Sequence, residues 1–398
     1  MKSKRLRVAL VNQRYGMEVN GGSEYYTRQL AEHLKNVCEV EVLTTKALDY
    51  ITWENYYQDD METLNGVLVR RFPCEKKRNV LGMRILKKIR QYSPFFQEYL
   101  ENKWMDAQGP YCPELIKYIA ENQKEYRVFI FVTYLYYHTA RGIFAAGRKA
   151  ILAPTAHDEP YIYFHIFREI FSRPQGMIYL TPEEKEFVEN LFPVAEKKNC
   201  ICGSGVELPD VIDNQQFRKK YKIDQEYFIY IGRIDPGKNC SEMFRVFRAY
   251  KKFHPEDAVK LVLMGKAVMP VPEDPDILAL GFVSEEDKFN GLAGARALWL
   301  PSQYESLSIA VLEALSLRIP VIVNGKCKVL KGHCERSGAG LYYYDEEKAV
   351  EYLGVLSSNQ EKHKVMSCNA RTYIEKNYQW DSVIDRIMGL IYSLEENV

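Results

Sequence analysis

The chain has 398 residues, 46% of them hydrophobic and 27% charged, which is the composition of a globular protein long enough for two domains with separate cores. The formal net charge of +1 gives no overall attraction to nucleic acid, so a nucleic-acid partner is not expected. Nine cysteines without any C-x-x-C pair argue for reduced thiols and against a zinc site or a disulfide framework.

Short β-branched or aromatic runs alternate with amphipathic helical stretches, a pattern typical of open parallel sheets. Each half of the chain is therefore predicted to form a doubly wound, Rossmann-like α/β domain. The apolar stretch 8–11 is too short for a signal peptide or a spanning helix, and a cytoplasmic protein is expected. The predicted strands cover residues 7–12, 39–44, 67–72, 128–133, 150–155, 176–180, 199–202, 227–232, 260–264, 279–280, 298–301, 320–323 and 341–343.

The segment 203–209, GSGVELP, has the glycines and the proline of a linker. It predicts an N-terminal domain over 1–204 and a C-terminal domain over 205–379. Apolar residues at helical spacing predict a terminal helix within 380–398. Thr181 and Ser284 each precede a helix and have an acidic residue three positions later, Glu184 and Asp287, which predicts capping boxes.

A glycine pair follows the first predicted strand. Asn20-Gly21-Gly22-Ser23 precedes a helix predicted over 24–34, so its backbone can approach a phosphate or an acceptor closely. A plain turn is the alternative. The segment is not G-x-G-x-x-G, which argues against a dehydrogenase.

The segment Lys76–Arg90 carries seven basic residues and no acidic one. On a helical wheel, Leu81, Ile85, Leu86 and Ile89 face largely away from Arg84, Lys87 and Lys88. This pattern is typical of a helix that lies on an anionic membrane surface. A helix packed on its own domain with a solvated basic side is the alternative.

Two glutamates, Glu305 and Glu313, are separated by seven residues where a loop enters a predicted helix. Strands are predicted on both sides, so the segment reads as a βαβ unit whose helix N-terminus offers backbone N–H groups to a diphosphate. Those groups belong to Ser306, Leu307 and Ser308. Glu305 is placed beside a sugar, and Glu313 is placed where it accepts hydrogen bonds from two adjacent hydroxyls. Glutamates at this spacing also occur on solvated helices.

This segment resembles the EX7E signature of retaining glycosyltransferases with the GT-B fold, in particular glycosyltransferase family 4. The stretches YIGRIDPGKN at Tyr230–Asn239, GFVSEED at Gly281–Asp287 and PTAHDEP at Pro154–Pro160 resemble three further motifs of the same family, in the same order. The resemblance implies two Rossmann-like domains that face a cleft, with a C-terminal helix crossing back onto the N-terminal domain.

The resemblance also implies roles for individual residues. Arg233 and Lys238 hold the donor diphosphate and stabilise its charge as the bond breaks, His157 orients the transferred sugar, and Asp158 with the glycine loop lies on the acceptor side. The nucleobase is lined by Gly281, Phe282 and Val283.

The resemblance is weaker in two places. Family members often carry Gly-Gly-x-x-Glu after the last Rossmann strand, whereas this chain has NGKCKVLKGHCERSGAGLYY at 324–343. The spacing Asp274-Pro-Asp276 is that of a D-x-D metal motif, but it lies in a proline-rich stretch where a solvated turn is the better interpretation. No metal and no other cofactor is expected.

The sequence thus predicts a metal-independent retaining glycosyltransferase. Its donor is a UDP or GDP sugar, and its acceptor is a hydroxyl of a glycan or lipid-linked glycan in cell-surface polysaccharide biosynthesis. The N-terminal domain binds the acceptor and the C-terminal domain binds the donor. Two other classes remain open: a sugar-nucleotide epimerase of similar architecture, and a non-catalytic two-lobed sugar-binding protein, which the lack of a signal peptide disfavours.

Overall fold

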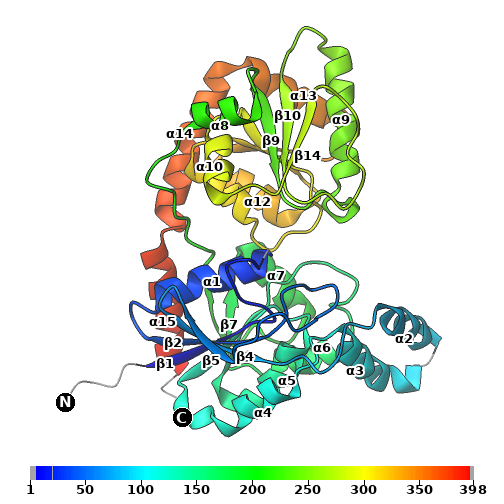
Figure 1. Cartoon of the computed structure of the whole chain (residues 1–398), viewed down its shortest axis with the longest axis vertical. Coiled ribbons are helices and arrows are strands. Elements are labelled where there is room, and N and C mark those ends of the chain that lie inside the picture. The colour runs from blue at the N-terminus through cyan, green and yellow to red at the C-terminus, as the bar shows by residue number, and fades with distance from the viewer. Residues whose placement is uncertain (1–5, 20, 93, 395–398) are drawn as a thin grey trace. The chain divides into compact units, whose positions relative to one another are not determined.

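The computed structural model describes residues 6–19, 21–92 and 94–394. Two compact units make up the chain (Figure 1): unit 1 is Met1–Ser204 with Trp380–Val398, and unit 2 is Gly205–Gln379. Asn20 of the predicted glycine loop and residues 395–398 of the predicted terminal helix lie outside the described residues.

Unit 1 is built on an eight-stranded sheet with the order β3-β4-β2-β1-β5-β6-β7-β8. Every neighbouring pair is parallel except β3 and β4. The order runs outward from β1 in both directions, which is the doubly wound arrangement predicted from the sequence. The strands are β1 (Arg7–Val11), β2 (Glu39–Thr45), β3 (Met61–Leu64), β4 (Val67–Phe72), β5 (Val128–Val132), β6 (Ala150–Ala153), β7 (Gly176–Tyr179) and β8 (Lys198–Ile201).

The helices of unit 1 cover both faces of this sheet (Figure 1). Strands β1, β5 and β6 are almost wholly buried, which explains their continuous apolar runs. The helices are α1 (Gly22–Leu34), α2 (Val80–Tyr92), α3 (Gln97–Gln108), α4 (Pro113–Glu121), α5 (Tyr137–Ala146), α6 (Ile166–Ser172), α7 (Pro182–Leu191) and α15 (Trp380–Ser393), with short 3₁₀ turns η1 (Pro94–Phe96), η2 (Gln123–Glu125) and η3 (Gly147–Lys149).

The edge strand β3 is missing from the strands predicted above. It forms a hairpin with β4 through Asn65 and Gly66, both of which have positive φ, at 50° and 78°. Asn-Gly between two short apolar runs is a strong hairpin signal, because both residues tolerate this conformation. The sequence therefore contains a signal for the turn. The strand itself was not predicted, because apolar and polar side chains alternate only weakly over residues 61–64.

Unit 2 is built on a six-stranded parallel sheet with the order β11-β10-β9-β12-β13-β14, again doubly wound. Its strands are β9 (Tyr227–Ile231), β10 (Lys260–Met264), β11 (Ile277–Gly281), β12 (Ala297–Leu300), β13 (Val321–Asn324) and β14 (Gly340–Tyr343). Its helices are α8 (Asn214–Tyr221), α9 (Cys240–Phe253), α10 (Glu285–Ala293), α11 (Ile309–Ser316), α12 (Lys328–Ser337), α13 (Glu346–Ser358) and α14 (Gln360–Asn377), with the 3₁₀ turn η4 (Pro236–Lys238).

Both predicted hydroxyl caps are present. Thr181 accepts a hydrogen bond from the N–H of Glu184, and Ser284 accepts one from the N–H of Asp287, each at 3.1 Å. The Glu184 side chain also makes contacts beyond the cap. It accepts from the N–H of Leu180 and from that of a residue 28 positions earlier, Ala156, each at 2.6 Å.

The terminal helix α15 packs on β8 and α1 of unit 1. Arg386 donates to the carbonyl of Cys202 at 3.1 Å, and Trp380 stacks on His33 with ring centroids 4.1 Å apart. His33 on α1 is therefore partly covered by a helix from the other end of the chain. Among the described residues, no helix is both long and apolar enough to span a bilayer.

Candidate active-site residues

Lys238 and Glu305 come together at the carboxyl ends of two neighbouring strands, β9 and β12. The Nζ of Lys238 lies 2.6 Å from Oε1 of Glu305, and both side chains are partly buried. In open α/β sheets this edge is where ligands bind. The predicted phosphate-binding lysine and the first glutamate of the pair are thus direct neighbours.

Arg233 joins this group through Asp235, which is buried. One Asp235 oxygen lies 3.0 Å from Nε of Arg233, and the other accepts from the backbone N–H of Lys238 at 2.8 Å. Asp235 therefore fixes the turn η4 and holds both cationic residues on one short segment. About half of the Arg233 side chain is exposed, so its guanidinium is accessible to a ligand.

The loop from β12 to α11 ends at Ser308, which has φ 66° in the left-handed region. Within the part of the chain that the structure describes, its hydroxyl caps none of the N–H groups of α11. Those groups and the positive end of the helix dipole are suited to an anion. Ser306 and the buried Leu307 lie on the same loop, as predicted.

A buried histidine supports this loop. His333 on α12 lies with Nε2 2.8 Å from the Leu307 carbonyl and Nδ1 3.0 Å from the Tyr373 hydroxyl. The carbonyl only accepts, so Nε2 carries the proton and Nδ1 accepts from Tyr373. Burial, reinforced by Arg336, lowers the His333 pKa to about 4, which keeps the ring neutral. No sequence signal pointed to this role, because His333 lies in the stretch that departs from the family pattern.

Glu313 lies one turn further along α11 and pairs with a different lysine. The Nζ of Lys288, on α10, is 2.6 Å from Oε1 of Glu313, and the glutamate is almost completely buried. Burial raises the Glu313 pKa, and Lys288 opposes that rise. The predicted contact of Glu313 with two ribose hydroxyls stays a prediction, and Lys288 is a polar partner that the sequence analysis missed.

The predicted base-lining segment begins at the last residue of β11. Gly281 has φ 71°, a conformation that favours glycine, and a Cβ there would meet nothing within 4 Å. The Phe282 ring is 71% exposed, so its face is available for stacking. Val283, which is half-buried, leads into the cap of α10.

In unit 1, His157 follows β6 on a turn held by two glutamates. Glu184 accepts from the N–H of Ala156, and Oε1 of Glu159 lies 3.7 Å from Nε2 of His157. Tyr134, at the end of β5, donates to the same Glu159 oxygen at 2.6 Å. The sequence analysis assigned no role at this turn to Glu159, Tyr134 or Glu184. Only the fold brings Tyr134 and Glu184 to it, from the ends of β5 and β7.

Two further features complete the turn. Thr155 has φ 50°, a left-handed conformation unusual for a β-branched residue. Asp158 is exposed and accepts from the Tyr163 hydroxyl at 2.6 Å. The predicted acceptor-side carboxylate is thus at the surface of unit 1, tied to an exposed aromatic ring.

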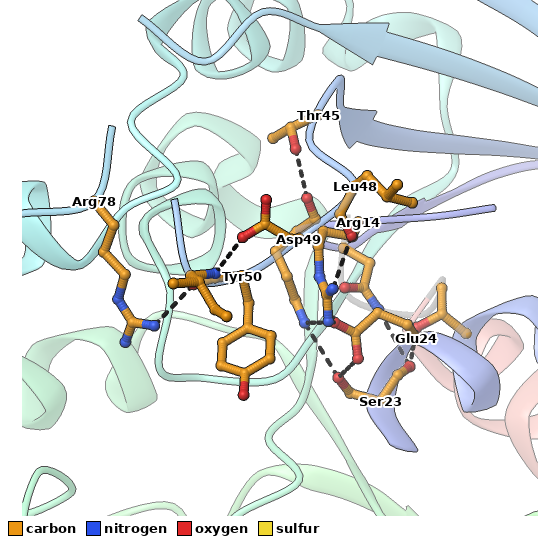
Figure 2. A network of polar contacts seen from close by, with 12 residues as sticks. Arg14, Ser23, Glu24, Thr45, Leu48, Asp49, Tyr50 and Arg78 are labelled. Carbon is orange, nitrogen blue, oxygen red and sulfur yellow. Dashed lines mark hydrogen bonds and ion pairs between the residues drawn. The ribbon is translucent and has the colours of Figure 1, made fainter. Parts of the chain in front are cut away.

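The glycine loop leads into a buried polar network (Figure 2). Arg14 donates to Glu24 from Nε at 3.0 Å and to the carbonyl of Leu48 at 2.9 Å, and Ser23 donates to the other Glu24 oxygen at 2.7 Å. A Cβ on Gly21 would lie 2.2 Å from Glu24 Oε2, whereas one on Gly22 would meet nothing within 4 Å. Gly21 is required by packing, and Gly22 faces open space.

The carboxylates of the D-x-D spacing belong to ion pairs. Asp276 contacts Lys260 at 2.6 Å and Lys251 at 3.1 Å, and Asp274 contacts Arg248 at 3.1 Å. Burial of Asp276 is outweighed by its hydrogen bonds to the two lysines, so its pKa is lowered. Among the described residues, no group of three or more His, Cys, Asp or Glu side chains is arranged to hold a metal ion.

Three comparisons bear on this arrangement. Residues 212–373 match the family described as glycosyl transferases group 1. An uncharacterised glycosyltransferase of Methanocaldococcus jannaschii is 22% identical over 410 residues, covering 95% of this chain and 96% of that protein. A glycosyltransferase 1 domain-containing protein of Xenopus tropicalis is 24% identical, covering 57% and 70%.

Solved structures match along almost the whole chain. Sucrose-phosphate synthase from Thermosynechococcus elongatus has a TM-score of 0.68 at 14% identity, covering 99% of this chain and 100% of that one. HepE of Anabaena, in complex with UDP and glucose, has a TM-score of 0.70 at 12% identity, covering 98% and 100%. The fold is therefore that of GT-B glycosyltransferases, and together with the domain match over 212–373 it supports a glycosyltransferase of the GT-B type.

Proposed function

We propose that this protein is a retaining glycosyltransferase of family 4 that transfers a hexose from a nucleoside-diphosphate sugar to a hydroxyl of a glycan or lipid-linked glycan. The observation that carries the proposal is the contact of Lys238 with Glu305, beside the N-terminus of α11. A cation and a helix N-terminus suit a diphosphate, and a carboxylate at the same strand edge can accept hydrogen bonds from sugar hydroxyls. HepE is solved with UDP and glucose, which favours UDP over GDP.

In this proposal the diphosphate contacts the N–H groups of α11, Arg233 and Lys238. Breaking the bond from the anomeric carbon to the diphosphate leaves negative charge on a β-phosphate oxygen. Fixed cations stabilise that charge without having to reorganise. Arginine grips two oxygens in a fork, and lysine acts as a point charge.

The acceptor hydroxyl attacks the anomeric carbon from the face that the diphosphate leaves. The new carbon–oxygen bond forms as the old one breaks, and the hydroxyl proton passes to the departing phosphate oxygen. The anomeric configuration is retained, and no protein nucleophile is needed. Glu305 lies beside the sugar, and His157 orients it through a hydrogen bond.

The acceptor side belongs to unit 1. Gly22 leaves its backbone accessible, and Asp158 offers an exposed carboxylate. Both follow strands of the same sheet, β1 and β6. A role in cell-surface polysaccharide synthesis and a cytoplasmic location stay predictions.

Metal independence is part of the proposal, and it rests on the two cations. Arg233 and Lys238 supply the charge that Mg²⁺ or Mn²⁺ supplies in other sugar-nucleotide sites. The D-x-D carboxylates are already paired with lysines and an arginine, so they are a poor fit to a metal.

The direct test incubates the protein with UDP-glucose and other nucleotide hexoses and measures free nucleoside diphosphate. Release that increases with an added glycan acceptor is the expected result. An epimerised donor without transfer to any acceptor would favour the epimerase instead. Binding of a sugar with no turnover of any donor would favour the sugar-binding protein.

The matched control is Arg245→Ala. Arg245 lies on α9 of the same unit and forms an exposed ion pair with Glu346 at 2.6 Å. Exposed pairs of this kind contribute about 0–1 kcal/mol to stability. Its loss should leave both turnover and donor binding unchanged.

A further inference from the structure

The segment from α2 through η1 into α3 exposes many large apolar side chains. Figure 1 shows α2 at the outer edge of unit 1, with α3 and α6 between it and the sheet. The exposed fractions of these side chains run from 44% for Ile89 to 95% for Phe95. We call the set the hairpin patch: Leu81, Ile85, Ile89, Tyr92, Phe95, Phe96 and Tyr99.

Helix α2 has two apolar faces. Met83 is buried and Leu86 packs against the core of unit 1, so these two residues form the inner face. Leu81 and Ile85, spaced by one turn, are 69% and 48% exposed on the outer face. A surface helix of a globular protein has one apolar stripe, which it buries. The second stripe is not explained by packing within the described chain.

The outer face is also basic. Arg84 and Lys88 are exposed and lie along one side of the apolar stripe, and α2 contains no acidic residue. The helical-wheel prediction placed Leu86 on the same apolar face as Leu81, Ile85 and Ile89, turned away from Arg84, Lys87 and Lys88. The structure corrects it, because Leu86 packs on the core and Arg84 and Lys88 are exposed beside the outer stripe. Glu98 on α3 is an exposed acid near the patch, and Lys103 is an exposed base on the same helix.

The inner basic residues of α2 anchor it to the body of unit 1. Lys87 lies over the ring of Tyr161 at 4.8 Å, and Arg90 lies over that of Phe164 at 4.2 Å. Arg90 also contacts the buried Glu101 at 3.1 Å, and Glu101 accepts from the N–H of Ile166. Helices α2 and α3 are therefore fixed to the segment that directly follows the His157 turn.

We propose that the hairpin patch docks on an anionic lipid bilayer. Outward apolar side chains flanked by cations are the combination that an anionic interface recognises. Because Lys87 and Arg90 of α2 contact the segment that follows the His157 turn, docking would hold unit 1 at the bilayer through that segment. If the proposed transferase activity holds, this implies an amphiphilic acceptor whose lipid stays in the bilayer.

A second copy of this chain is a poorer occupant of the patch. In a two-fold dimer a surface meets itself, so two patches that each carry Arg84 and Lys88 would be brought together. Such like-charge contacts oppose association. Anionic headgroups neutralise these cations.

The experiment measures co-sedimentation of the full chain with vesicles, without any donor present. Protein is expected to pellet with phosphatidylcholine vesicles that contain phosphatidylglycerol and to stay in the supernatant with phosphatidylcholine alone. Binding should weaken as salt rises. The double variant R84E/K88E should bind at least roughly tenfold more weakly, because each basic residue near an anionic surface contributes about 1 kcal/mol.

Insertion of the apolar side chains of the patch into the bilayer is tested separately. The double variant F95S/F96S should lose binding, whereas K252E/F253S should not. Lys252 and Phe253 are an equally exposed basic and aromatic pair on α9 of unit 2. All four native tryptophans are buried, so a Phe95→Trp variant reports on the patch, and brominated lipid should quench its fluorescence.

Two outcomes would overturn the proposal. One is wild-type protein that stays in the supernatant with anionic vesicles. The other is a concentration-dependent dimer that F95S/F96S abolishes, which would assign the patch to a second copy. Neither outcome depends on turnover, so failure of the proposed reaction would show separately as absence of nucleotide release.

Discussion

Lys288 Nζ and Glu313 Oε1 lie 2.6 Å apart, on α10 and α11, with the glutamate almost completely buried. Lys288 has a second carboxylate within reach, since Glu285 lies 3.5 Å away at the surface. Glu313 has no such alternative partner among the contacts found in the described residues. In the proposed complex, ribose hydroxyls would either share the Glu313 carboxylate with Lys288 or displace Lys288 toward Glu285.

The two glutamates of the pair should affect different steps. Glu313→Ala removes the proposed ribose contact, which exists before and during reaction, so UDP binding should weaken. Glu305→Ala acts beside the sugar, so the rate with bound donor should fall while UDP binds almost as before. Calorimetry with UDP alone measures the contrast. The fold should tolerate Glu313→Ala because Lys288 can turn to Glu285. The reverse pattern would refute this placement of the carboxylates.

Replacing Lys288 by methionine should make stability more pH-dependent. Burial already raises the Glu313 pKa, and loss of the lysine raises it further. A carboxyl whose folded-state pKa is raised contributes stability below its ordinary pKa, and that contribution is lost as pH rises through the folded-state value. The unfolding free energy of the variant should therefore fall increasingly below that of wild type as pH rises above about 4.5. Urea unfolding at several pH values measures this, and a pH-independent difference would contradict it.

Removing either cation should impair turnover. Arg233→Ala or Lys238→Ala should lower it by on the order of a hundredfold or more, the size typical of losing one partner of a developing negative charge. Steady-state kinetics measures the loss, with Arg245→Ala as the control. Near-normal turnover in both variants would exclude these residues from the site.

Chelation should leave the enzyme active. If Arg233 and Lys238 supply the charge at the diphosphate, dialysis against EDTA should not change the rate. The assay is nucleotide release before and after dialysis, with a metal add-back as control. A strict need for added magnesium or manganese would refute the metal-free site.

Acid should weaken the support of the Leu307 loop. The His333 pKa is about 4 in the fold against an ordinary value of 6.5, so its contribution to stability is present above pH 6.5 and is lost as pH falls toward 4. The loss relative to a non-titrating His333→Gln variant should be on the order of 3 kcal/mol at pH 4. Denaturant unfolding of both proteins measures it. His138 is another buried histidine with a pKa of about 4. Both proteins contain it, so its effect on stability cancels in the difference between them. A constant difference between pH 7 and 4 would contradict this role.

The sequence alone determined the fold class. Buried parallel strands need apolar residues on both faces. Continuous apolar runs such as those of β5 and β10 can therefore be recognised as strands from the sequence. Helix N-caps can be predicted in the same way, because the Thr181 and Ser284 hydroxyls accept hydrogen bonds from residues only three positions away. The missed strand β3 also had a local signal, in Asn65-Gly66.

Only the tertiary structure decided which distant groups meet. Lys288 reaches Glu313 across 25 positions, and Glu184 reaches Ala156 across 28. Spacing shows which residues share a helix face, but which face is covered depends on packing against other elements. For that reason the apolar residues of α2 were predictable as a set, whereas their division between core and exterior followed from the position of α3 against the body of unit 1.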